Sequence, residues 1–80
     1  MSSATTAYLV RRLADGTMRT VQSTSPKGAM RLFAASYGPP IGEGFAVKSR
    51  GGSDEWEVFQ VTATGLRSRG VASSGDLAGE

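Results

Sequence analysis

The stretch from Thr24 to Pro40 carries the strongest helix signals in the chain, and it therefore sets the plan of the fold. Ser25 or Thr24 offers a side-chain oxygen to the first free N–H groups of a helix. Pro26 suits the first helical position, where its missing N–H is not needed. Gly38 can adopt the left-handed conformation that ends helices, and the two prolines after it prevent continuation. These signals predict one helix of about three turns.

Apolar residues recur at helical spacing along one side of this predicted helix. They are Ala29, Leu32, Phe33 and Tyr37, with Met30 and Ala34 beside them. Lys27 and Arg31 lie mostly on the other side. A helix of this length is not stable alone in water, so we expect it to pack on a sheet with Phe33 as its main anchor.

Residues that favour strands flank the helix on both sides. The Asp15-Gly16 pair indicates a tight hairpin turn, and residues 51–54 form a second turn. Residues 64–69 either add a short strand or have no regular secondary structure. The four expected strands lie at residues 7–13, 18–23, 45–50 and 55–62.

A two-residue loop at Asp15-Gly16 sets Arg12 opposite Arg19 in the first hairpin, a repulsive pair unless an acid or an anionic ligand lies between them. This register separates the apolar side chains into two groups. One face receives Tyr8, Val10 and Val21, and the other receives Leu9, Leu13 and Met18.

Charge pairing favours one register for the second hairpin, with Arg50 opposite Glu55 and Lys48 opposite Glu57. The same register divides the remaining side chains between the two faces. Phe45, Val47, Trp56 and Val58 are then buried, while Ala46, Phe59 and Val61 project to the other face.

Together these elements predict an α+β fold, a two-layer sandwich with a four-stranded, mostly antiparallel sheet in ββαββ order and one helix on one face. Residues 1–6 are expected to be a disordered lead, residues 7–69 a single domain and residues 70–80 a disordered tail.

A single helix covers only one face of such a sheet, yet six apolar side chains project to the other face in this interpretation. Either a bulge turns Phe59 and Val61 inward, or another subunit, the tail or a partner covers the second face. The six residues are Leu9, Leu13, Met18, Ala46, Phe59 and Val61.

Composition removes most catalytic chemistry from consideration. The 80 residues include no His and no Cys, so the commonest general base, thiol nucleophiles and the imidazole and thiolate metal ligands are missing. We therefore expect no enzyme activity, no cofactor and no metal. The chain lacks an apolar run of membrane-spanning length, so we expect no membrane association and a cytoplasmic location.

The expected function is protein–protein contact or self-association through the sheet face opposite the helix. This interface is predicted to contain Leu9, Leu13, Met18, Phe59 and Val61, with Arg11 and Arg50 on its rim. The alternative is a nucleic-acid-binding module, because the net charge is +2 and the first half of the chain is basic. That surface would use Arg12, Arg19, Lys27, Arg31, Arg67 and Arg69.

Overall fold

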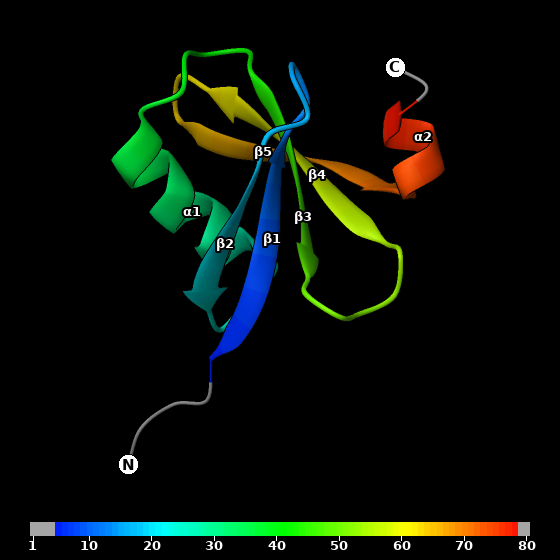
Figure 1. Cartoon of the computed structure of the whole chain (residues 1–80). Coiled ribbons are helices and arrows are strands. Elements are labelled where there is room, and N and C mark those ends of the chain that lie inside the picture. The colour runs from blue at the N-terminus through cyan, green and yellow to red at the C-terminus, as the bar shows by residue number, and fades with distance from the viewer. Residues whose placement is uncertain (1–4, 79–80) are drawn as a thin grey trace.

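A five-stranded antiparallel sheet with one main helix forms the domain, in a computed structural model that describes residues 5–78. The strands lie in the order β2-β1-β3-β4-β5, and the two helices lie on opposite sides of the sheet (Figure 1). The α+β class and the antiparallel sheet are confirmed, whereas the expected count of four strands is wrong. The elements are β1 (Thr6–Arg12), β2 (Met18–Ser23), α1 (Pro26–Tyr37), β3 (Gly44–Ser49), β4 (Trp56–Thr62), β5 (Gly65–Ala72) and α2 (Ser74–Ala78).

Local chemistry fixes both ends of α1 as the sequence predicts. The Ser25 side chain accepts a hydrogen bond from the N–H of Gly28 at 3.0 Å, and Pro26 begins the helix. Gly38 adopts the left-handed conformation, with φ 67° and ψ 49°, and its N–H donates to the carbonyl of Ala34 at 2.8 Å. The boundaries of the helix are therefore set by residues within the segment itself.

The buried side of α1 differs from the expected one. Ala29 and Met30 are fully buried, Phe33 is half-buried, and Leu32 and Tyr37 are 55% and 45% exposed. The small Ala29 lets the helix approach the sheet closely, and the flexible Met30 side chain fills the space beneath it. Phe33 instead packs at one end of the core, against Phe45. The main anchor is therefore Met30.

The first hairpin is shifted by two residues from the predicted register. Tyr8 lies opposite Val21 and Val10 opposite Arg19, so the expected Arg12–Arg19 pair does not form. The tight turn that we expected needs positive φ at both central residues, and Gly16 alone has it here, at 76°. A longer loop closes instead, with the Asp15 carboxylate accepting from the Thr17 N–H. Because the shift is even, each side chain stays on its expected face.

The second hairpin is shifted by one residue, which exchanges the faces of β4. Phe45 lies opposite Phe59, and Val47 opposite Glu57. Full burial of a phenylalanine contributes about 1.5–3 kcal/mol, whereas each cross-strand charge pair contributes about 0.2–1 kcal/mol. Burial of Phe59 therefore outweighs the charge pairs used in the prediction. Neither of those pairs forms an ion pair within residues 5–78.

The sheet has an apolar cluster on each face. The helix face, defined as the side that carries α1, buries Tyr8, Val10, Ala29, Met30, Phe45, Val47 and Phe59. The reverse face, on the opposite side, buries Ala46, Trp56 and Leu77, with Leu9, Leu13, Val58 and Ala72 against them. The reverse face of the sheet thus has its own small apolar core.

The last part of the chain is not the disordered tail that we expected. The structure continues β5 to Ala72 and places α2 immediately after it, with Leu77 buried on the reverse face. The tail is one of the three possible covers of this face predicted from the sequence, beside another subunit and a partner. Of the expected disordered lead, residues 1–4 lie outside the described residues, and Thr6 begins β1. Residues 79 and 80 also lie outside them.

Truncation of Phe45 tests the importance of the helix-face core. Phe45 is fully buried between Phe33 and Phe59, so Phe45→Ala should lower the free energy of unfolding by about 3–5 kcal/mol. A domain of 80 residues has about 4–12 kcal/mol in total. Urea titration followed by circular dichroism measures the change. Arg31→Ala, on exposed α1 surface away from β2, serves as the control and should change it by less than about 0.5 kcal/mol; equal losses would contradict this core assignment.

Candidate functional site

The predicted interface on the reverse face is only partly assembled. Phe59 is 1% exposed and lies in the helix-face core, and Val61 packs against the same cluster, so neither side chain reaches the reverse face. Leu9 and Leu13 do lie there, packed against the cluster of Ala46, Trp56 and Leu77. The one-residue shift of β4 therefore removes two of the five apolar interface residues.

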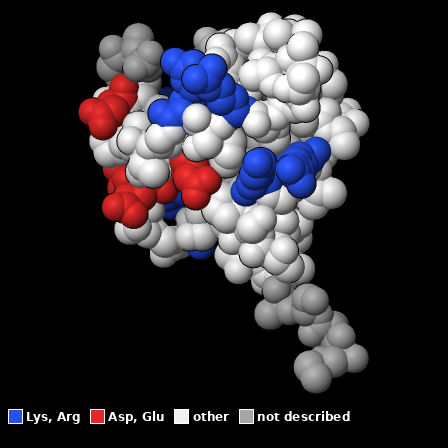
Figure 2. All heavy atoms as spheres, turned by 180° about the vertical axis from the view of Figure 1, so that it is seen from behind, with Lys and Arg blue, Asp and Glu red and all other residues white. Residues whose placement is uncertain are grey.

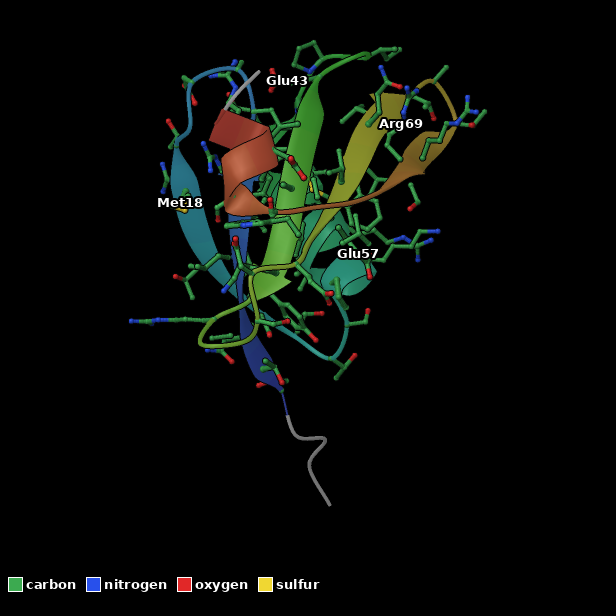
Figure 3. All side chains as sticks on the ribbon, turned by 90° about the vertical axis from the view of Figure 1, so that its right-hand side faces the viewer. Met18, Glu43, Glu57 and Arg69 are labelled. Carbon is green, nitrogen blue, oxygen red and sulfur yellow. The ribbon has the colours of Figure 1, made fainter. Side chains whose placement is uncertain are left out.

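The short helix α2 covers part of the reverse face, as seen from that side in Figure 3. The Asp54 carboxylate accepts hydrogen bonds from the backbone N–H of Ser74, at 3.0 Å, and from the Ser74 hydroxyl. The Trp56 indole N–H is shared between Ser74 Oγ, at 3.0 Å, and Asp54 Oδ1, at 3.2 Å. These bonds fix the start of α2 while Leu77 contacts the apolar cluster. We call Asp54, Trp56 and Ser74 the α2 anchor.

The remaining predicted interface residues lie apart from one another. Met18 is 53% exposed at the start of edge strand β2, and Figure 3 shows it at one margin of the sheet. Arg11 is half-buried between Met18 and Ala46, and its Nε has no hydrogen-bond partner within the described residues. Arg50 is exposed in the turn after β3. Met18 is therefore the member of the set that remains open to a partner at an edge.

Arg12 belongs to an internal ion-pair network. Its guanidinium donates two hydrogen bonds to Glu43, at 3.0 and 3.1 Å, and a third to Asp15 at 3.0 Å. It also lies 5.6 Å from the centre of the Tyr37 ring. The hydrogen bond with Glu43 is the largest cause that raises the pKa of Arg12 above its usual value. Arg12 thus connects the first hairpin to the loop before β3, and its charge is paired within the domain.

The other basic residues of the nucleic-acid alternative lie on three different elements. Arg19 is on β2, Lys27 and Arg31 are on α1, and Arg67 and Arg69 are on β5. On the face shown in Figure 2, most of the basic surface lies in two groups, one near the top and one at the right, with acidic side chains to the left of the upper group and below it. The Arg69 guanidinium donates to the side chain of Gln60 at 3.0 Å. On the face that Figure 2 shows, the basic side chains are thus not gathered into a single group.

Two grooves flank α1. The edge groove, between α1 and β2, has a volume of about 370 Å³ and is lined by Arg19, Thr20, Val21, Leu32, Phe33, Ser36 and Tyr37. The hairpin groove, between α1 and the β4–β5 hairpin, has a volume of about 700 Å³. Its helix wall contains Lys27, Arg31, Ala34 and Ala35, and its hairpin wall contains Val61, Leu66 and residues 62–65 between them.

The sequence interpretation missed the edge groove because it assigned Leu32 and Tyr37 to the buried side of α1. Both residues fit the helical period of the apolar stripe, so periodicity alone does not separate them from Met30. With Ala29 and Met30 centred on the sheet, Leu32 lies about 110° away around the helix, at the margin of the buried side. Tyr37 lies on the same side as Ala29 and Met30, but it is the last residue of α1 and is exposed at that end of the helix. The apolar pattern of the sequence gives no signal for either position.

Two further observations limit the chemistry of these surfaces. Within residues 5–78, no group of three or more His, Cys, Asp or Glu residues is placed to hold a metal ion. In the same part of the chain, no helix has the length and apolar character needed to cross a membrane.

Comparison with known proteins adds no further constraint on the site. The chain matches no known protein family, no curated protein and no solved structure.

The α2 anchor predicts a pH dependence at Trp56. Hydrogen bonds from Ser74 and Trp56, with the Ser74 hydroxyl as the largest cause, hold the pKa of Asp54 below its usual value. The stabilisation is present above about pH 4, the usual range of the group, and is lost as the pH falls through the lowered pKa. Acrylamide quenching of Trp56, the single tryptophan, should therefore increase on acidification. Asp54→Asn should already show increased quenching at pH 7.

Asp15→Asn is the matched control for this experiment. The pKa of Asp15 is also lowered, chiefly by the backbone N–H of Thr17, but Asp15 lies in the first hairpin and makes no contact with the α2 anchor. This control should leave the quenching of Trp56 unchanged at pH 7. Wild-type quenching in Asp54→Asn at pH 7 would show that the carboxylate does not hold α2.

Proposed function

We propose that the protein is a small non-catalytic binding module that associates with a second copy of itself through the outer edge of β2. The observation that carries this proposal is an edge strand with free backbone groups and exposed apolar side chains on both sides. It retains the expected protein–protein role but moves the interface from the reverse face to the edge of the sheet.

The hydrogen-bond pattern of the first hairpin indicates which backbone groups of β2 are free. The Arg12 N–H donates to the Thr17 carbonyl at 2.8 Å. Bonding alternates along an antiparallel pair, so Arg19, Val21 and Ser23 direct their backbone groups toward β1. The N–H and C=O groups of the residues between them point outward, and no strand within residues 5–78 pairs with them. These residues are Met18, Thr20 and Gln22.

The two edges of the sheet differ in how open they are to another strand. In β5, Val58 lies opposite Gly70 and Phe59 opposite Ser68, so Arg69 is an extra residue that makes a bulge. A bulge bends an edge strand, and charged side chains also discourage pairing. The six residues of β2 include neither a bulge nor a proline, and Arg19 is their only charge. This difference supports β2 as the interacting edge.

Exposed apolar side chains flank β2 on both faces. Leu32 and Tyr37 line the edge groove on the helix face, and Met18 is exposed on the reverse face. Two copies paired along β2 would bring both sets of side chains together and remove them from water. Such burial contributes about 25 cal/mol for each Å² of apolar surface, in addition to the strand hydrogen bonds.

A pairing centred on Thr20 satisfies the backbone without a charge conflict. Met18 then lies opposite Gln22 of the second copy, and Thr20 opposite its counterpart. Arg19 lies opposite Val21 of the second copy, so the two arginines are not direct cross-strand neighbours. The resulting interface is a continuous sheet across a two-fold axis.

Thr20→Pro tests this proposal because it removes an outward N–H and leaves the bonds between β1 and β2 in place. Sedimentation equilibrium of the wild type should show a mass that rises with concentration toward that of a dimer. Thr20→Pro should remain a monomer with an unchanged far-ultraviolet circular dichroism spectrum.

Thr20→Val is the control, because it keeps the N–H and should dimerise like the wild type. A wild type that stays monomeric at its highest soluble concentration would contradict the proposal. Dimerisation of folded Thr20→Pro with wild-type affinity would contradict it as well.

A further inference from the structure

The hairpin groove is not used by the proposed strand pairing, because it lies on the opposite side of α1 from β2. Lys27, Arg31, Ala34 and Ala35 are spaced so that they follow one side of the helix. The two alanines are small, and they leave the space between the helix and the β4–β5 hairpin unfilled. Val61 and Leu66 supply apolar surface on the hairpin wall.

The charge of this groove is of one sign. Lys27 and Arg31 are exposed, and neither forms an ion pair within residues 5–78. The residues that line the groove include no Asp or Glu. Lys27 also lies in the first turn of α1, which has no acidic residue, and a cation there is unfavourable to the helix dipole. The groove therefore presents uncompensated positive charge beside apolar surface.

We infer that the hairpin groove is a docking site for a segment of a partner protein that carries acidic side chains beside apolar ones. Carboxylates of the segment pair with Lys27 and Arg31, and its apolar side chains contact Ala34, Val61 and Leu66. A polypeptide fits this groove better than a nucleic acid, because no aromatic side chain lines it for base stacking.

The experiment uses two fluorescein-labelled synthetic peptides, Glu-Asp-Glu-Leu-Val-Leu and the same residues in reversed order, with fluorescence anisotropy as the readout. At low salt at least one peptide should bind the full-length protein, and a version with Lys in place of each acid should not. The double variant Lys27→Ala/Arg31→Ala should weaken binding by about fivefold or more.

Two further variants distinguish binding of the peptide in the groove from its general attraction to a basic protein. Arg67→Ala removes a positive charge from β5, outside the groove, and should change the affinity by less than about twofold. Ala35→Leu keeps every charge but narrows the hairpin groove, so it should weaken peptide binding. Binding should persist in Thr20→Pro, so failure of this inference is distinguishable from failure of the proposed dimer.

Several results would overturn the inference. They are the absence of binding by either acidic peptide at low salt, equal weakening by Arg67→Ala and by Lys27→Ala/Arg31→Ala, and no effect of Ala35→Leu. A labelled thymidine oligonucleotide provides the last arm of the experiment. If it binds more tightly than the peptides and depends on Lys27 and Arg31, the groove is a nucleic-acid site instead.

Discussion

The pairing of Phe45 with Phe59 across β3 and β4 decides which face of the sheet every nearby side chain occupies. Side chains alternate between faces along a strand, so this register places Phe59 and Val61 on the helix face. It equally sends Trp56 and Val58 to the reverse face. The second apolar cluster, and with it the place where α2 packs, follows from this choice.

The parts of the fold that sequence predicts well depend on neighbouring residues. Ser25, Pro26 and Gly38 determine the ends of α1 through bonds within the same segment, and they do so as expected. Registers depend instead on contacts between separate segments, where burial competes with charge pairing. The second hairpin follows the burial of Phe59, which no local pattern of charges reveals.

The candidate surfaces were harder to predict because they depend on how α1 is placed over the sheet. Leu32 and Tyr37 fit the apolar stripe of the helix and were assigned to the core, but both are exposed. The C-terminal segment was misread for a related reason. Its small polar residues resemble a tail, and only the uncovered Trp56 gives Leu77 a place to pack.

The bulge at Arg69 and Gly70 has a consequence for how large an assembly this chain can build. A sheet grows indefinitely only when both of its margins accept a further strand, as in amyloid fibrils. A symmetric pairing along β2 would use the regular edge of the sheet in each molecule. The two outer edges of the paired sheet would then be the bulged β5 strands. Growth would then stop at a closed pair, and polymers would be disfavoured by the geometry of β5 itself.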